Sequence, residues 1–234
     1  MKSVWLTRSY SQNLELEQQL KFCNFKLINQ PLITYVDYGK VIDENVINRY
    51  TSIIVTSKHA AKIIVNSSLA YRKAVINVWV VGDNSAMILK QAGFKIEFIA
   101  INVEHLITNL PQSLYNKMIY LSANIITQML PKEIKRLIIY LVKYNIKLSP
   151  NKVSIFKQGI DYILLYSKNC ANTLIQVMNR YHLYKLKKST IIALSSKIAQ
   201  EISPYFDNVL HCDIERHNTI IELLIKNEKY AATI

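Results

Sequence analysis

Glycine, proline and cysteine are all scarce in this chain of 234 residues. The four glycines never cluster, so the chain has neither a glycine-rich dinucleotide fingerprint nor a phosphate-binding loop. The three cysteines, Cys23, Cys170 and Cys212, are scattered and odd in number. That usage is typical of reduced thiols and excludes a small domain held together by disulfides.

A long apolar run is also missing. The longest, Leu137 to Val142, is far shorter than the ~20 residues that span a membrane. The start, Met1 to Arg8, lacks the apolar stretch of a signal peptide. We therefore expect a cytoplasmic protein that has no membrane partner. With 50% hydrophobic residues, the chain has enough apolar material for two domains of ordinary size.

Acidic residues are few, 16 against 29 basic ones, and the formal net charge is +13. This excess favours an anionic partner. Motifs of other chemistries are missing: no serine stands in a nucleophile elbow, and nothing marks a cysteine as a nucleophile. His211, Cys212, Asp213 and His217 are close in sequence, but no second Cys or His pair accompanies them, so we expect no metal site.

Two stretches, Ser52 to Ala100 and Asp161 to Asp213, repeat one pattern. Each opens with an apolar strand that ends on Ser-Lys, at Ser57-Lys58 and at Ser167-Lys168, and continues into helix-like sequence. A second apolar strand with small polar residues at its end follows in both. This spacing predicts a strand, a crossover helix and a parallel strand, twice.

The remaining strands are expected at residues 4–7, 26–33, 118–121 and 137–144, with a helix around residues 14–20. Near-continuous apolar strands are covered on both faces. The fold class is therefore α/β, with parallel sheets flanked by helices as in flavodoxin-like folds. Tyr35 to Lys40 and Asn145 to Asn151 are typical of linkers between the domains.

Small polar or cationic residues follow most of these strands. Ligands of parallel α/β sheets bind beyond the carboxyl ends of the strands, where the next helix presents free backbone N–H groups. A cleft built in this way suits a ligand with several carboxylates. The same serines and asparagines are also ordinary helix N-caps, and for any single strand end capping is the simpler interpretation. The candidate binding residues are Thr7, Arg8, Thr56, Ser57, Lys58, Ser85, Ser122, Asn124, Ser167, Lys168 and Ser195.

A series of short segments follows one order along the chain: Thr7-Arg8, Pro31-Leu32-Ile33, Thr56-Ser57, Val81-Gly82-Asp83-Asn84-Ser85-Ala86, Ala92-Gly93 and the strands ending at Ser167 and Ser195. This order resembles one family, the uroporphyrinogen-III synthases of tetrapyrrole and heme biosynthesis. The resemblance extends over nearly the whole chain. It departs from the family where Ser122-Ala123 replace the usual Arg-Gly, and where Ser195 and Ile198 replace Gly and Thr.

The resemblance implies two lobes joined by two linker strands, lobe one being residues 1–34 plus 148–234 and lobe two residues 35–147. It implies a cyclising lyase that converts hydroxymethylbilane, a linear octacarboxylate, into uroporphyrinogen III with inversion of ring D and loss of water. Family members use no metal or organic cofactor. Loss of the substrate's hydroxyl converts the substrate into a reactive azafulvene without further activation. Control of substrate conformation is therefore the main catalytic task.

The family carries a tyrosine at the return linker, for which Tyr144 is the best match and Tyr140 the alternative. The resemblance implies that Tyr144 hydrogen-bonds or protonates the departing hydroxyl, since a neutral phenol can donate. Arg8, Lys58 and Lys168 are candidates to meet the substrate's propionate or acetate groups.

Two rival functions remain. Arg180 to Lys188 interleaves cations with aromatics, as a groove for single-stranded nucleic acid does. We prefer a solvated helix end and loop there, because basic residues are spread along the chain, and we do not expect a nucleic-acid partner. The second rival is a bilobed ligand binder without catalysis on the same fold. No coiled-coil seam is present, and we expect a monomer.

Overall fold

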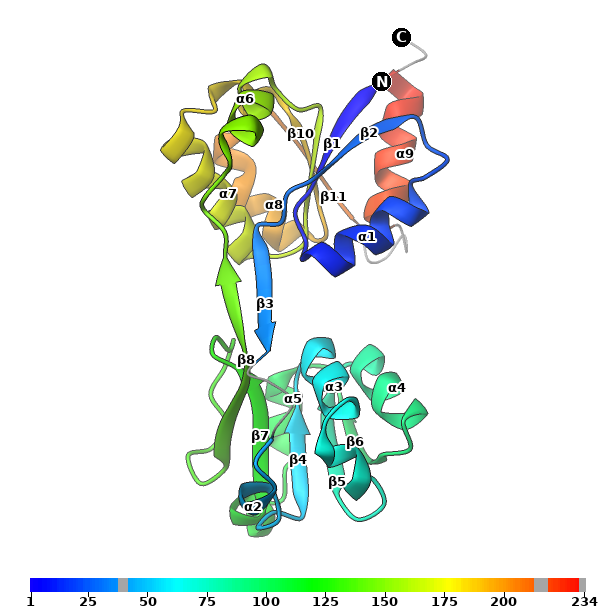
Figure 1. Ribbon diagram of the computed structural model, residues 1–234, viewed down its shortest axis with the longest axis vertical. Helices are drawn as coiled ribbons and strands as arrows, with labels where there is room; N and C mark the ends of the chain where they lie inside the picture. The colour runs from blue at the N-terminus through cyan, green and yellow to red at the C-terminus, as the bar shows by residue number, and fades with distance from the viewer. Residues whose placement is uncertain (38–41, 213–218, 232–234) are drawn as a thin grey trace. The chain divides into compact units, whose positions relative to one another are not determined.

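The computed structural model describes residues 1–37, 42–212 and 219–231 (Figure 1). Its residues divide into two compact units. From here on, lobe one denotes Met1–Thr34 with Lys143–Ile234, and lobe two denotes Tyr35–Val142. The chain passes from one unit to the other twice, through strand β3 (Ile33–Asp37) and through strand β8 (Lys135–Tyr144).

Lobe one is a parallel sheet with helices on both faces. Its strands are β1 (Lys2–Leu6), β2 (Phe25–Asn29), β9 (Tyr162–Leu165), β10 (Thr190–Ala193) and β11 (Asn208–His211). Its helices are α1 (Tyr10–Gln19), α6 (Pro150–Gln158), α7 (Lys168–Tyr181), α8 (Ser196–Ile202) and α9 (Ile220–Ala231). The strand order is β11-β10-β9-β1-β2, and every neighbouring pair is parallel.

Alternate strand residues fill two separate cores in lobe one. Trp5 packs with Phe156 and Leu174 on the face covered by α6, α7 and α8. Val4 and Leu6 pack on the opposite face with Leu224 of α9 and with apolar residues of α1. Figure 1 shows α1 and α9 together on that face. A sheet covered on both sides explains why its strands are apolar almost throughout.

Lobe two repeats this plan with a six-stranded sheet in the order β3-β8-β7-β4-β5-β6. The pairs β4–β5, β4–β7, β5–β6 and β7–β8 are parallel. Helices α3 and α4 cover one face and α5 the other. The further elements are α2 (Glu44–Ile47), β4 (Ser52–Val55), α3 (Lys58–Val65), β5 (Asn77–Val81), α4 (Asp83–Gln91), β6 (Lys95–Ala100), α5 (Val103–Asn109) and β7 (Met118–Ala123).

The repeat predicted from the sequence is confirmed. The units β4-α3-β5 and β9-α7-β10 are both strand, helix and parallel strand, with Ser57 and Ser167 at the same place in each. The predicted fold class, α/β with parallel sheets flanked by helices, is confirmed as well. Cys23, Cys170 and Cys212 are free thiols. In the described part of the chain, no helix is long and apolar enough to cross a membrane.

Two local predictions were wrong. Residues 26–33 are not one strand, because β2 ends at Asn29 and Pro31, which lacks a backbone N–H, precedes β3. Of the linker expected at Tyr35 to Lys40, Tyr35 to Asp37 form the end of β3, which carries the chain from lobe one to lobe two, and the rest lies outside the described residues. Pro150 does not mark a linker but the first turn of α6, where a missing N–H costs nothing, and the Ser149 hydroxyl caps that helix.

The connection from β7 to β8 differs from the other parallel crossovers. Residues 124–134, all of them described, form no helix and only turns and irregular chain. Ile125, Ile126 and Thr127 are consecutive β-branched residues, and Pro131 follows, so the local sequence disfavours a helix. Ile126 and Leu130 of this segment pack beside α5 on the Trp79 side of the sheet.

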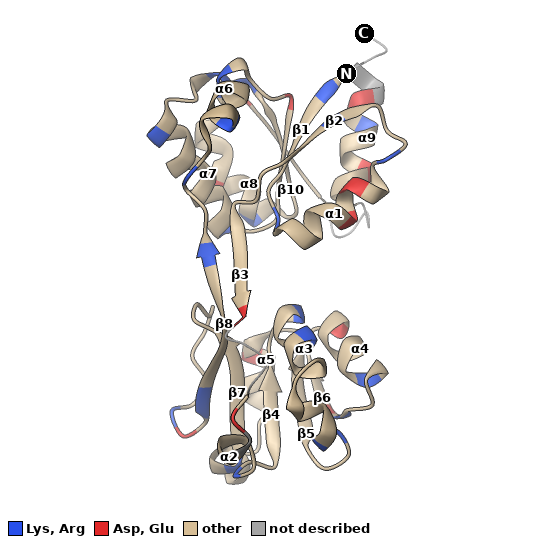
Figure 2. Ribbon diagram, in the orientation of Figure 1, with Lys and Arg blue, Asp and Glu red and all other residues tan. Residues whose placement is uncertain are grey.

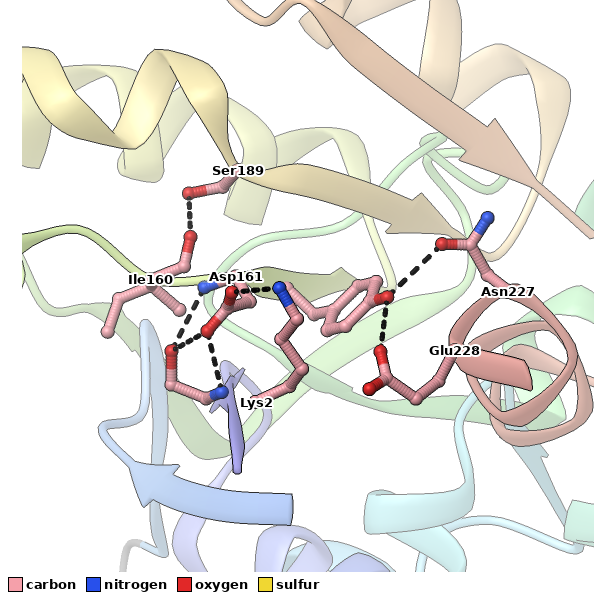
Figure 3. A network of polar contacts seen from close by, with 8 residues as sticks. Lys2, Ile160, Asp161, Ser189, Asn227 and Glu228 are labelled. Carbon is pink, nitrogen blue, oxygen red and sulfur yellow. Dashed lines mark hydrogen bonds and ion pairs between the residues drawn. The ribbon is translucent and has the colours of Figure 1, made fainter. Parts of the chain in front are cut away.

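At the amino-terminal edge of the lobe-one sheet, Asp161 joins two strands (Figure 3). Its carboxylate accepts hydrogen bonds from the Ser3 backbone N–H at 2.8 Å and the Ser3 hydroxyl at 2.7 Å, and pairs with Lys2 at 3.0 Å. Burial opposes ionisation of Asp161, but the hydrogen bonds from Ser3 and the ammonium of Lys2 outweigh it and lower the pKa of Asp161. Nearby, the Tyr162 hydroxyl donates to Glu228 of α9 at 2.9 Å.

Asp161→Asn is expected to destabilise lobe one in a pH-dependent way. The lowered pKa means that the carboxylate stabilises the fold above the unfolded value of about 3.9, and that this stabilisation is lost as the pH falls through the folded pKa. We expect about 1 kcal/mol at pH 7, since the side chain is 36% exposed and solvent screens the ion pair. Urea unfolding at several pH values measures the difference.

Asp207→Asn is the matched control, because Asp207 is exposed and forms no ion pair with any described residue. The difference in stability between the two variants should be constant near neutral pH and shrink as the pH falls below about 3.9, the unfolded pKa of Asp161. A difference that grows on acidification would contradict the assigned role of Asp161.

Candidate functional site

Thr7 and Arg8 follow β1 at the carboxyl edge of the lobe-one sheet. Thr7 is buried, and its hydroxyl donates to the backbone oxygen of Leu164 on β9. The Arg8 guanidinium lies 4.6 Å from the centre of the Tyr166 ring. Within the described residues no carboxylate pairs with Arg8, so its charge is available to an anionic ligand.

Sequence reasoning missed Tyr166, which directly follows β9. Its hydroxyl is buried and has no hydrogen-bond partner among the described residues. Burial raises the pKa of Tyr166 to about 12, although Arg8 opposes this rise. The phenol is therefore neutral at the same sheet edge as Arg8. Tyr166 ends an apolar run that predicts a strand, so in the sequence it resembles a core residue and nothing marks it as part of a site.

Ser167, Lys168 and Ser195 lie where helices leave this edge. The Ser167 hydroxyl accepts from the backbone N–H of Cys170 at 3.2 Å, so the capping interpretation is correct for it. Ser195 is the N-cap residue of α8 but makes no capping bond with its side chain. Lys168 is exposed and lies 3.5 Å from Glu201. Capping engages one N–H of the first turn and leaves others for an anion.

Tyr144, at the end of β8, lies beside the first turn of α7. Its hydroxyl oxygen accepts a hydrogen bond from the Asn169 side-chain amide at 2.9 Å. Burial raises the pKa of Tyr144, while the bond from Asn169 acts in the opposite direction. Because Asn169 donates to the oxygen, the phenol retains its own proton for another acceptor. This arrangement is that of a neutral hydrogen-bond donor.

Tyr140, the alternative to Tyr144 as the family tyrosine, is a core residue of lobe two. It is 4% exposed in the core of lobe two, and its hydroxyl lies 2.9 Å from the Ser57 hydroxyl. Its ring packs edge-on against those of His59 and Tyr35. His59 in turn contacts Asp37 at 2.7 Å. Tyr140 therefore supports the strand end after β4 from inside the lobe.

Thr56, Ser57 and Lys58 follow β4 at the carboxyl edge of the lobe-two sheet. The Thr56 hydroxyl lies 2.7 Å from that of Tyr120 on β7. Ser57 caps α3, accepting from the backbone N–H of Ala60 at 3.0 Å, so capping is correct here too. Lys58 is exposed.

Ser85 lies in the first turn of α4, after β5, and is only 4% exposed. The turn before it depends on Gly82, whose φ of +83° is strained for any other residue. The first turn of α4 therefore offers its backbone N–H groups at this edge, while the Ser85 side chain is buried in the protein.

Ser122 was expected after β7, but it lies inside the strand and is buried, because β7 continues to Ala123. The Asn124 side chain is bound to the backbone of Val142, accepting from its N–H at 2.7 Å and donating to its oxygen at 3.4 Å. Asn124 thus extends the ladder between β7 and β8. Both side chains already have protein partners.

Arg136 of β8 was not a candidate in the sequence, yet it lies against this strand end. Its Nε donates to the Ser122 hydroxyl at 2.8 Å, and its Nη2 donates to the backbone oxygens of Ala123 and Asn124. Burial raises the pKa of Tyr120, while Thr56 and Arg136 act in the opposite direction. The contact joins residues separated by an irregular segment, so no local pattern could reveal it.

The structure thus gathers the candidates into two groups. Thr7, Arg8, Ser167, Lys168, Ser195 and Tyr144 lie at the carboxyl edge of lobe one. Thr56, Ser57, Lys58, Ser122 and Asn124 lie at that edge of lobe two, with Ser85 one strand further. Figure 2 marks the cations of both lobes.

Among the described residues no group of three or more His, Cys, Asp or Glu could hold a metal ion, and Asp213 and His217 lie outside them. Residues 180–188 form the end of α7, with His182 as its left-handed C-cap, and a short 3-10 helix. That is the helix end preferred over a nucleic-acid groove.

Two α/β sheets thus carry cations, hydroxyls and helix starts at their carboxyl edges, the edge at which sheets of this class bind their ligands. The family model described as Uroporphyrinogen-III synthase HemD matches residues 15–210. The chain belongs to the uroporphyrinogen-III synthase family.

One curated relative and two solved structures match nearly the whole chain. An uncharacterized protein of Rickettsia prowazekii is 34% identical over 280 residues, which cover 98% of this chain and 100% of the relative. The uroporphyrinogen-III synthetase of Helicobacter pylori has a TM-score of 0.60 at 17% identity, covering 96% of this chain and 98% of its own. A mutant uroporphyrinogen III synthase of Thermus thermophilus has a TM-score of 0.62 at 11% identity, covering 100% of both chains. At these identities the two structures support the fold.

Proposed function

We propose that this protein is a cyclising lyase that converts hydroxymethylbilane into uroporphyrinogen III, with inversion of ring D and loss of water. The observation that carries the proposal is the family match over residues 15–210, which extends through both sheets. The cationic and hydroxyl-bearing sheet edges support it, because the substrate carries eight carboxylates.

We propose that Tyr144 assists loss of the substrate hydroxyl. The group leaves more easily when it is protonated or accepts a strong hydrogen bond. Tyr144 stays neutral because burial raises its pKa, and Asn169 fixes its oxygen without taking its proton. Departure of water gives an azafulvene that reacts by itself. The protein then needs to direct closure to the substituted carbon of ring D, which gives a spiro intermediate on the way to the type III isomer.

We propose that the strand ends hold the substrate's carboxylates and so set that conformation. Arg8 and Lys168 in lobe one and Lys58 in lobe two supply the charge. Backbone N–H groups at the starts of α3, α7 and α8 supply uncharged donors. The remaining proposed contacts are Thr7, Thr56, Ser57, Ser85, Ser122, Asn124, Ser167 and Ser195.

We further propose that the enzyme acts in the cytoplasm as a monomer, without a metal or an organic cofactor. The chemistry supports the last point, because the azafulvene forms and reacts without an electron acceptor or a Lewis acid.

Complementation tests the proposed function in a cell. A bacterial strain without its own uroporphyrinogen-III synthase cannot make heme, and expression of this chain should restore heme-dependent growth. The matched control is an Arg8→Ala, Lys58→Ala, Lys168→Ala triple variant, which should restore growth poorly. Absence of rescue by a chain that is expressed and folded would argue against the proposed activity.

A further inference from the structure

The irregular segment between β7 and β8 forms a groove in lobe two. The groove has a volume of about 350 Å³, at the small end of the range for ligand pockets. Apolar side chains make up much of its wall, and Lys132, Lys135 and Arg136 add three cations. Its residues are Tyr120, Ile126, Met129, Leu130, Pro131, Lys132, Ile134, Lys135 and Arg136.

Arg136 is the most constrained of these cations. It is half-buried, and its Nε and Nη2 are held at 2.5–2.9 Å by the Ser122 hydroxyl and the backbone oxygens of Ala123 and Asn124. None of these bonds uses Nη1. Among the described residues no carboxylate pairs with the guanidinium, and the neighbouring acid, Glu133, does not line the groove. A partly desolvated cation with only neutral partners favours an anion.

The place of this cation is informative. Its three acceptors, Ser122, Ala123 and Asn124, lie at the carboxyl end of β7. A guanidinium from β8 is therefore held at the strand end of its neighbour β7. Tyr120, which lines the groove, also contacts Thr56 at 2.7 Å, so the groove adjoins the strand end after β4.

We propose that this groove is a subsite for one carboxylate-bearing pyrrole of the substrate, with Arg136 binding an acetate or propionate group. Ile126, Met129 and Leu130 pack against the ring, and Lys132 and Lys135 face the second carboxylate. The groove suits one pyrrole with its two side chains rather than a whole tetrapyrrole. The proposal rests on the proposed function, and it assigns a specificity role to a segment that replaces a crossover helix.

Two variants test the subsite in different ways. Arg136→Gln removes the charge but keeps a side chain that can bond Ser122. Met129→Glu leaves Arg136 in place and offers it a carboxylate, and since Met129 is 69% exposed, the fold should tolerate the change. Met87→Glu is the matched control, because Met87 is 52% exposed on α4, which covers the opposite face of the same sheet.

The measurements are KM and kcat for type III formation, and the Kd of uroporphyrin III, a stable octacarboxylate, for the folded protein. We expect both groove variants to raise KM and Kd about tenfold with kcat within about twofold of wild type, and Met87→Glu to change neither. Melting temperatures establish that each variant is folded.

Unchanged KM and Kd in both groove variants would overturn the subsite. A wild-type protein that forms no type III isomer would instead refute the proposed function. In that case the uroporphyrin III titrations still decide whether Arg136 binds a carboxylated pyrrole.

Discussion

Replacing Tyr144 with phenylalanine is expected to slow formation of the type III isomer about 100-fold, with little change in KM. A positioned general acid contributes about 10²- to 10⁴-fold, and the lower end applies because the azafulvene forms readily without help. The phenylalanine keeps the ring and removes only the proton donor next to Asn169. Because the pKa of Tyr144 is raised above its usual value of 10, Tyr144 keeps its proton at every pH below 10. Over that pH range, deprotonation of Tyr144 should not reduce the wild-type rate. Initial rates at several pH values measure both effects.

Tyr140→Phe is the matched control for this substitution. Tyr140 is buried and its hydroxyl contacts Ser57, so its loss should cost about 1 kcal/mol of stability and only a small part of the activity. If Tyr140→Phe lost the activity and Tyr144→Phe retained it, the assigned roles of the two tyrosines would be reversed.

Phe156→Ala is expected to destabilise the protein by about 3–5 kcal/mol, the usual cost of removing a buried phenylalanine. Phe156 is 0% exposed and stacks on Trp5 with 4.1 Å between ring centres. Trp5 is fixed in turn, since its indole N–H donates to the backbone oxygen of Gln30 at 2.7 Å. The surrounding side chains therefore cannot collapse easily into the cavity. We expect a melting temperature lower by on the order of 10 °C, measured by calorimetry.

Phe22→Ala provides the comparison in the same lobe, because Phe22 is 95% exposed. Its melting temperature should match that of the wild type within about 1 °C. Similar losses in the two variants would show that the Trp5–Phe156 contact is not the centre of the lobe-one core.

The strand-based part of the fold could be predicted because it depends on local pattern. The apolar strands that end at Ser57 and Ser167 and their following helices repeat at a spacing that permits little besides a parallel crossover. Pro150 was misassigned because proline is favoured in the first turn of a helix as well as in linkers. The missing helix between β7 and β8 was also not foreseen, although Pro131 and the β-branched run from Ile125 to Thr127 disfavour one.

The sequence allowed only those site residues to be predicted whose position depends on where a strand ends. Thr7, Ser57 and Ser167 lie at the carboxyl edges because that edge is fixed by strand direction. Ser122 was misplaced because a strand that continues for one or two residues carries the serine into the core. The contacts of Arg136 with Ser122 and of Asn169 with Tyr144 join separate elements, so they depend on packing that one sequence does not reveal.

The isomer composition of the product decides whether this chain is a synthase. Freshly generated hydroxymethylbilane is supplied to the purified protein in EDTA, the products are oxidised, and the type I and type III uroporphyrins are separated by chromatography. We expect type III to predominate over the protein-free control, in which the substrate closes without inversion to type I. Type I alone, formed at the control rate by a folded protein, would contradict the synthase assignment and leave a ligand binder on the same fold.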